Sequence, residues 1–336
     1  MPAGITATDG MMYTGATPWH RLGVQLDGEA TAAEAIAAAQ MDWKVETQTV
    51  YQKKTEPYTV GMTEQQFGAL RSYYQEIPNK RAVVRTDTQE VFAIMGDGYE
   101  PVQNSEAFGF FDSVIGQGEA IYHTAGSLYG GKRIWILAKL PEDIEVIPGD
   151  VIQPYILLSN SHDGSQALRM QITPIRVVCW NTLSAALQRQ GGFYAKHTRH
   201  VMERANEARE VLGLAHAYFE MFAKQVDQLV NTRMTVIEVQ DYLQQVYRFK
   251  ADQTYADQDH RIVKSYETTL DLLNHPTNTV GGIAGTRWAA YNAVSYYVDH
   301  ERPVRGGAYR DDRRLDASWF GTGAELRQRA YDLLTV

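Results

Sequence analysis

Residues 80–95 read KRAVVRTDTQEVFAIM, two short apolar runs on either side of a polar turn. Residues 80–85 and 91–95 favour two strands, and the polar turn favours a hairpin connection between them. Upstream, residues 42–52 (DWKVETQTVYQ) alternate β-forming and polar side chains with a period of two, which is typical of a third strand. Downstream, the phenylalanine-rich amphipathic segment 106–115 predicts a helix. We therefore expect a strand–strand–strand–helix unit.

A second group of strands is expected after this unit, at residues 120–125, 133–140, 151–158 and 167–179. Pro174 interrupts the last of them. Because proline cannot donate a hydrogen bond to a sheet ladder, we expect a bulge or a sheet edge there.

One short helix is expected near the N-terminus. Thr31 is placed as the N-cap of a helix over residues 32–39, and Glu34 stands at its third position. This spacing is that of a capping box, in which the two side chains satisfy each other's backbone N–H groups.

The C-terminal part predicts helices almost throughout. From Thr198 to about residue 232, apolar residues recur at three- and four-residue steps, which predicts one long helix. Shorter helices are expected at residues 236–248, 260–273, 282–300 and 325–334, with a charged loop at 302–314. The fold class is therefore α+β: an antiparallel β-sheet portion with a β-β-β-α core over residues 1–197, then a mainly α-helical region, 198–336, packing on it.

The composition indicates a globular protein. The chain has 336 residues, 44% of them hydrophobic, and can bury a large core without disulfides. Its one cysteine, Cys179, fits a reducing cytosol, and its apolar surroundings (RVVCW) favour an inert core thiol. Apolar runs are far shorter than the roughly 18 residues that span a bilayer, and the N-terminus lacks a signal-peptide pattern. We expect a cytoplasmic protein without a membrane segment.

A basic segment interrupts an acidic chain. The net charge of −8 argues against a non-specific coat on nucleic acid. Between Asn160 and Glu210, however, seven lysines and arginines stand against four acidic residues, a net of +3. An anionic ligand site and a surface of mixed ion pairs both give this pattern. Arg169 and Arg176 are seven residues apart, so a bulge at Pro174 would bring them to one sheet face.

Four residues in this segment are candidate metal ligands: His162, Asp163, His197 and His200. A zinc site needs three or four ligands, and no cysteine or acidic residue nearby completes an established motif. Phosphate-binding, nucleotide-binding and hydrolase signatures are also absent from the sequence. We therefore expect no cofactor and no bound metal, and keep the four residues as an alternative.

Several motifs, in order along the chain, resemble those of the DUF932 family, also called the phage/plasmid-like protein family. They are WHRLG at 19–23, DWxV at 42–45, GYxPVQN at 98–104, SHDGS at 161–165, RVVCxNTL at 176–183, HT at 197–198, TRW at 286–288 and YNAV at 291–294. The resemblance implies a gene carried by a bacteriophage, prophage or plasmid in a bacterial host. It implies no activity.

The strand–strand–strand–helix order also resembles the core of Rad52-like single-strand annealing proteins. In that family a hairpin-rich sheet and a helix line a basic groove, often in an oligomeric ring, and hold a DNA strand by its phosphates. The 20 tyrosines of this chain are compatible with base stacking, whereas its acidic net charge and its second β segment, 120–179, depart from the pattern.

The leading functional hypothesis is a non-catalytic single-stranded-DNA-binding or annealing protein of a phage or plasmid. It would act in replication or recombination as a homo-oligomer, and the resemblance implies a ring. The candidate phosphate-binding residues are Lys132, Arg133, Arg169, Arg176, Lys196 and Arg199, and the candidate stacking residues are Tyr122, Trp135, Trp180 and Tyr194.

Two alternatives remain open. The first is a metal-dependent enzyme acting on nucleic acid through His162, Asp163, His197 and His200, which requires these side chains to converge on one ion. The second is an interaction protein that counters a host defence, with a partner surface in the helical C-terminal half.

Overall fold

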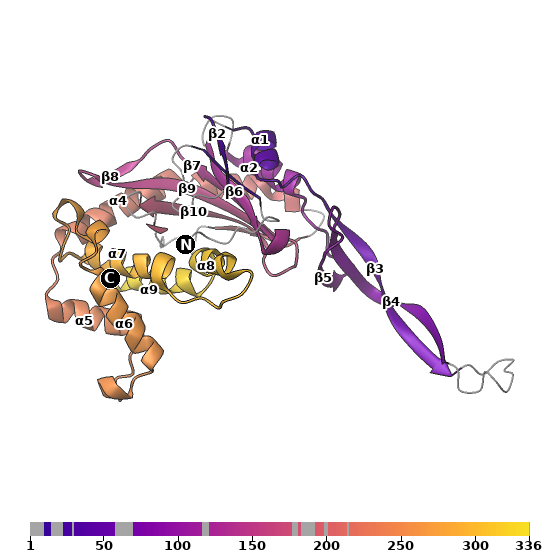
Figure 1. The fold of residues 1–336 in the computed structure, drawn as a ribbon. Coiled ribbons are helices and arrows are strands. Elements are labelled where there is room, and N and C mark those ends of the chain that lie inside the picture. Colours follow the sequence, from indigo (N-terminus) through magenta and orange to yellow (C-terminus); the bar gives the residue numbers. More distant parts are fainter. Residues whose placement is uncertain are drawn as a thin grey trace.

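The computed structural model describes residues 10–14, 23–28, 30–57, 70–115, 121–176, 181–182, 192–197, 201–213 and 215–335 (Figure 1). Antiparallel sheets make up most of the N-terminal part and helices most of the C-terminal part, which confirms the α+β class. Within these residues no helix combines the length and the apolar character that a membrane crossing requires.

The larger sheet has the strand order β11-β10-β9-β7-β6-β1-β2, with β12 added beside β10 and β8 beside β9. Its strand pairs are antiparallel except for β1 and β2, which run parallel. The strands are β1 (Met11–Thr14), β2 (Val24–Leu26), β6 (Ile121–Leu128), β7 (Arg133–Lys139), β8 (Ile144–Ile147), β9 (Asp150–Ser161), β10 (Leu168–Arg176), β11 (Asn181–Thr182) and β12 (Phe193–Ala195).

The smaller sheet forms an arm that projects from one end of the larger sheet (Figure 1). It contains β3 (Val45–Pro57), β4 (Leu70–Arg85) and β5 (Val91–Gly96), in that order. Because β5 pairs only with residues 80–84 of β4, the arm narrows further out to two strands. The hairpin predicted at 80–95 is confirmed. Strand β3 continues past its predicted end at residue 52, and β4 begins well before its predicted start at residue 80.

Two helices accompany the sheets. In α1 (Ala32–Ala38) the predicted capping box is confirmed, since Thr31 and Glu34 each bond the other's backbone N–H. Helix α2 (Asn104–Ile115) follows β5, as predicted, and packs on the larger sheet. Its Phe108 ring lies 5.6 Å from the ring of Tyr122 on β6. The expected strand–strand–strand–helix order is therefore present, with the helix lying on the second sheet.

The C-terminal helices depart from the predicted pattern at two places. The single helix predicted over 198–232 is wrong: a 3-10 turn (Val201–Arg204) is followed by two helices that break near Gly213. The charged loop predicted at 302–314 is also wrong in its second half, because a helix begins at Arg310. The helices are α3 (Ala205–Gly213), α4 (Ala215–Asn231), α5 (Val236–Val246), α6 (His260–Leu272), α7 (Arg287–Tyr296), α8 (Arg310–Trp319) and α9 (Thr322–Thr335).

Two apolar clusters cover the two faces of the larger sheet. The main cluster is continuous from the sheet and α2 into the C-terminal helices, where it includes Trp288 of α7 and Tyr331 of α9. The helical region therefore packs on the sheet region through a shared core. A smaller cluster on the opposite sheet face contains Trp135 and Leu157, and Leu315 and Trp319 of α8 pack against it.

Of the two alternatives expected at Pro174, a bulge or a sheet edge, the bulge is absent, and among the described strands Pro174 has an edge position on one side. Residues 169–176 of β10 pair with β9 in uninterrupted register, and Pro174 lies opposite Pro154. On its other side, β10 pairs with β12 at residues 168–170 and with β11 at 175–176, so Pro174 falls between these two short partners. Its missing N–H therefore costs no ladder bond. Without a bulge, positions 169 and 176 stay on opposite faces of the sheet.

Candidate nucleic-acid interface

A buried polar cluster joins three of the motifs that the sequence singles out. Its members, here called the Asn–His cluster, are Asn104, Asn160, His162 and His197. His162 Nε2 lies 2.9 Å from Asn104 Oδ1, and His197 Nε2 lies 2.5 Å from Asn160 Oδ1. The cluster therefore connects the start of α2, the end of β9 and the residues after β12.

The two asparagines also hold the backbone around them. Asn104 Nδ2 donates to the carbonyl oxygen of Met41 at 2.9 Å, and Asn160 Nδ2 donates to that of Val102 at 3.2 Å. Since each asparagine donates through its amide and accepts through its oxygen, the histidine Nε2 atoms carry the protons. The arrangement fixes the chain before and after the arm.

Burial keeps both histidines neutral. His162 is fully buried and His197 is 7% exposed. Burial lowers the pKa of His162 to about 3, and the nearby His197 lowers it further. Burial also lowers the pKa of His197 to about 4, against a smaller opposite effect of the Asp163 carboxylate. Neutral imidazoles held in one tautomer by asparagines have a structural role.

The metal-site alternative finds no support in this geometry. Each imidazole directs its Nε2 at an asparagine, and the described residues contain no group of three or more His, Cys, Asp or Glu side chains placed to hold a metal ion. His200 lies outside the described residues.

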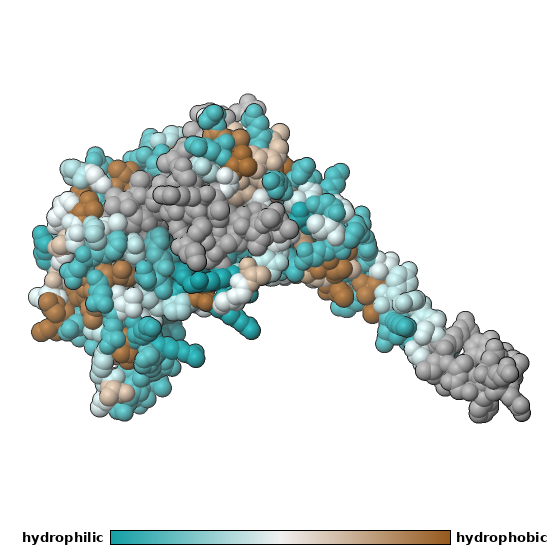
Figure 2. Space-filling view, in the orientation of Figure 1, coloured by the Kyte–Doolittle hydropathy of each residue, from teal (hydrophilic) through white to brown (hydrophobic). Residues whose placement is uncertain are grey.

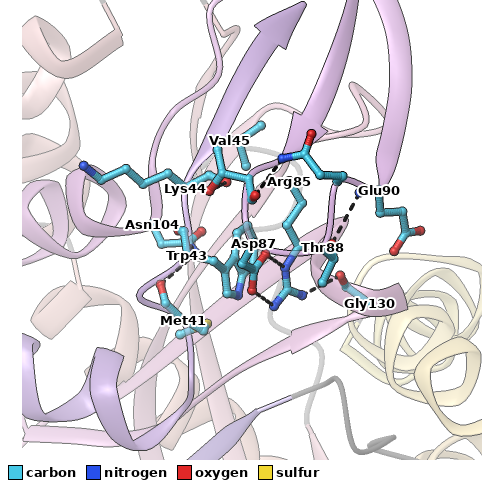
Figure 3. Close-up of polar contacts among 12 residues, drawn as sticks. Met41, Trp43, Lys44, Val45, Arg85, Asp87, Thr88, Glu90, Asn104 and Gly130 are labelled. Carbon is cyan, nitrogen blue, oxygen red and sulfur yellow. Dashed lines mark hydrogen bonds and ion pairs between the residues drawn. The ribbon is translucent and has the colours of Figure 1, made fainter.

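The root of the arm packs directly on this cluster. The Trp43 ring contacts that of His162 edge-on, with 5.3 Å between ring centroids. Figure 3 shows the Arg85 guanidinium beside Trp43, 4.4 Å from the ring centroid, where it also pairs with Asp87 and donates to the carbonyl oxygen of Gly130 at 2.9 Å. Arg85 therefore links the arm to the turn between β6 and β7.

The opposite face of the larger sheet carries a row of side chains across four strands. Trp135 of β7 lies opposite Ser159 of β9, Ser159 opposite Arg169 of β10, and Arg169 opposite Tyr194 of β12. Directly paired residues point to the same face, so these four form one cross-strand row. Arg133 lies on the same face, two residues before Trp135.

Helix α8 covers one end of this row. Arg133 forms an ion pair with Asp316 of α8 and donates to Ser165 Oγ at 3.0 Å. Trp135 is 3% exposed and meets the edge of Trp319 at a centroid distance of 5.2 Å. This half of the row is closed by protein.

The other end of the row is open. The Arg169 guanidinium lies 5.2 Å from the centroid of the Tyr194 ring, and Tyr194 is 41% exposed. Gln171 Nε2 donates to the Tyr194 hydroxyl at 3.3 Å. Two buried polar atoms beside them, Arg169 Nε and Ser159 Oγ, have no hydrogen-bond partner among the described residues. An arginine stacked on an exposed tyrosine is suited to a ligand that carries both a flat ring and an anion.

The sequence-predicted contact residues are only partly brought together. Four of the ten, Arg133, Trp135, Arg169 and Tyr194, share this sheet face. Lys196 is exposed just after β12, and the Lys132 ammonium lies 3.5 Å from a carboxylate oxygen of Glu90. Trp180 and Arg199 lie outside the described residues, and Arg176 is described only as a backbone position in β10.

Burial corrects the prediction for two of the stacking residues. Tyr122 is 7% exposed on the other face of the sheet, where its hydroxyl donates to the Asp112 carboxylate. Trp135 is enclosed between the sheet and α8. Neither ring presents a face to a nucleotide base, because alternation along the strand turns Tyr122 into the main core and α8 covers Trp135.

Sequence reasoning missed the two asparagines of the buried cluster. The sequence places Asn104 at the end of the GYxPVQN motif and gives Asn160 no role, whereas the structure shows that Asn104 begins α2 and that both side chains are buried. One feature of the sequence points to the cluster: the family-like motifs include GYxPVQN at 98–104, SHDGS at 161–165 and His197. Only the fold shows that these segments meet.

Residues 91–319 match the family described as "Domain of unknown function (DUF932)". The chain belongs to this family. The DUF932 match begins at β5 and ends in α8, so it contains the whole Asn–His cluster and the whole cross-strand row, whereas β3 and β4 precede it. No curated protein and no solved structure matched the chain, and the Rad52-like resemblance stays a prediction.

Proposed function

We propose that this DUF932 protein binds single-stranded DNA on the open end of the cross-strand row and performs no chemistry on it. The observation that carries the proposal is the Arg169–Tyr194 pair, a cation stacked on an exposed ring. Lys196, two residues from Tyr194, adds an exposed cation beside the partly buried Arg169. A strand would stack a base on the ring and place its phosphates on the cations.

Charge distribution supports this location. The segment from Asn160 to Glu210 has a net charge of +3, while the whole chain carries −8. The net negative charge of the whole chain would limit non-specific binding of DNA to it. Because every base has a ring face and every nucleotide a phosphate, we expect little sequence preference.

A role in the replication or recombination of a phage or plasmid belongs to the same proposal, as does assembly into a homo-oligomer. Annealing requires the bases of a bound strand to remain accessible, and a shallow sheet face meets that requirement better than a closed pocket. The mass of the protein in solution tests the oligomer, and an annealing assay with two complementary strands tests the activity.

The first experiment is a fluorescence-anisotropy titration with labelled single-stranded and duplex DNA over a range of salt concentrations. Wild-type protein should prefer the single strand and lose affinity as salt rises. Arg169→Gln should weaken binding and flatten the plot of log affinity against log salt by about 0.7 per lost phosphate contact. Arg261→Gln is the matched control, because Arg261 is an exposed arginine on α6, outside the proposed interface.

Two outcomes would overturn the proposal. Wild-type protein that binds no single-stranded DNA even at low ionic strength removes it entirely. Equal effects of Arg169→Gln and Arg261→Gln would show that binding depends on overall charge and not on this face.

A second candidate function is the protein-interaction alternative. Val236 and Ile237, adjacent residues at the start of α5, are 74% and 69% exposed, which favours a partner surface in the helical region. Replacing both with aspartate should abolish binding to such a partner and leave DNA binding unchanged. If a partner still binds the double variant, its binding site does not include the start of α5.

A further inference from the structure

The outer half of the arm exposes aromatic rings on a two-stranded ribbon. This ribbon comprises residues 51–57 of β3 and 70–76 of β4, paired in continuous register. Figure 2 shows the arm standing clear of the body. Tyr51 is 57% exposed and Tyr74 is 70% exposed. An isolated two-stranded hairpin is only marginally stable in water, so an exposed ribbon with large rings indicates a surface made for a partner.

Strand register puts two of these rings and a cation on one face. Lys53 pairs directly with Tyr74, and Tyr51 pairs with Glu76. Side chains alternate along each strand, so Tyr51, Lys53 and Tyr74 share a face, with Tyr51 and Tyr74 in diagonal positions about 7–8 Å apart. Glu76 on the same face forms an ion pair with Arg81 at 3.2 Å, which reduces its negative charge toward a ligand.

The other face of the ribbon also carries a lysine opposite a tyrosine. Lys54 pairs directly with Tyr73, and both are partly exposed. A lysine opposite a tyrosine therefore occurs on each face, at neighbouring positions of the ribbon. Each pair combines a ring for stacking with a cation for a phosphate.

Lysines set opposite tyrosines favour a polyanion as the occupant. The ribbon contains three basic residues, Lys53, Lys54 and Arg71, and two glutamates, Glu56 and Glu76, a net of +1, in a chain whose total is −8. A protein partner of ordinary composition gains little from isolated tyrosines set between lysines, whereas a nucleic-acid strand matches both the rings and the charges.

We infer that the ribbon is a second contact for single-stranded nucleic acid, with bases stacking on Tyr51 and Tyr74 and a phosphate held by Lys53. The inference rests on the proposed function, in that the same strand occupies the sheet face. The ribbon lies outside the segment that matches the family, so it extends the binding surface by means of residues that precede the match.

The test compares two double variants in the same anisotropy titration. Tyr51→Ala with Tyr74→Ala should weaken binding of a long single strand by about 5- to 150-fold per stacked base. Tyr51→Phe with Tyr74→Phe keeps both rings and should retain wild-type affinity. Circular dichroism and thermal unfolding of each variant establish that the ribbon change leaves the body folded.

A second, independent measurement locates the contact. Single-stranded DNA that carries photoreactive halogenated pyrimidines crosslinks to aromatic rings that stack on it. Peptides containing Tyr51 or Tyr74 should be recovered from wild-type protein after irradiation, and competing unlabelled single strand should abolish them. Lys53→Gln should reduce the salt dependence of binding by about 0.7 on the log–log plot.

The outcomes separate this inference from the function on which it rests. If wild-type protein binds no single strand, both are overturned. If wild-type protein binds, Arg169→Gln weakens binding and the alanine pair does not, the ribbon inference alone is wrong. Equal losses for the alanine and phenylalanine pairs would also refute it, because they would assign the effect to the hydroxyl groups instead of the rings.

Discussion

Acidification should destabilise this protein through the Asn–His cluster. The unfolded chain presents histidines with a pKa of about 6.5, whereas the folded values for His162 and His197 are about 3 and about 4. Between these limits the unfolded state binds more protons than the folded state, so the free energy of unfolding falls as pH falls. The two neutral histidines make their full contribution to the free energy of unfolding above about pH 7.5. This contribution is lost progressively as the pH falls from about 6.5 toward 4.

The size of the effect follows from the same values. At pH 5, protonation stabilises each histidine of the unfolded chain by about 2 kcal/mol, while the folded groups stay neutral. His162 and His197 together should therefore remove about 4 kcal/mol of unfolding free energy between pH 8 and pH 5. Total stabilities of about 5–15 kcal/mol make this a large fraction.

The assay is urea unfolding at pH 8 and pH 5 for the wild type and for His197→Gln. The variant keeps a donor for Asn160 and lacks the titratable group, so its loss of stability on acidification should be smaller by about 2 kcal/mol. His260→Gln, at an exposed position on α6, is the control and should behave as the wild type. The reasoning is refuted if the two variants lose equal stability, or if NMR shows His162 and His197 titrating near pH 6.5.

Two further predictions concern stability. Arg327 is 1% exposed in the core between α8 and α9, and Asp299→Asn would leave its guanidinium without a carboxylate partner. The substitution should lower the free energy of unfolding in urea titrations by about 3–5 kcal/mol. A loss below about 1 kcal/mol would show that the remaining hydrogen bonds are enough to stabilise the buried guanidinium. Gly131→Ala should lower the melting temperature more than Gly149→Ala does. Both positions have positive φ, but of the two only residue 131 places the new methyl group against a buried ring, that of Trp43, so equal shifts would contradict the packing argument.

The sequence predicts well those parts of the fold in which one face of an element is buried. The capping box of Thr31 and Glu34 and the strands at 80–95 follow from local chemistry and periodicity, and both are present. The outer part of the arm was not predicted because neither of its faces is buried. The described side chains of its two strands are largely exposed to water on both faces, so residues 53–57 and 72–79 show no apolar period.

The candidate site was predictable as a set of residue types and not as an arrangement. Arg169 and Tyr194 are 25 residues apart and become neighbours because β12 pairs with β10. The same pairing rule, applied to Tyr122, turns that ring into the core. Asn104 and Asn160 could not be found from periodicity, since a buried asparagine is explained only by the partners that its amide meets.

The two-stranded form of the ribbon affects how the arm can change in evolution. Its backbone hydrogen bonds run between its own two strands, and its side chains contact little of the body. Removing or adding two residues in each strand would change the reach of the arm by about 7 Å and keep every side chain on its original face, whereas a change of one residue would reverse the faces. Arm length can therefore vary among relatives in even steps, with no compensating change at the root where Trp43 and Arg85 are fixed.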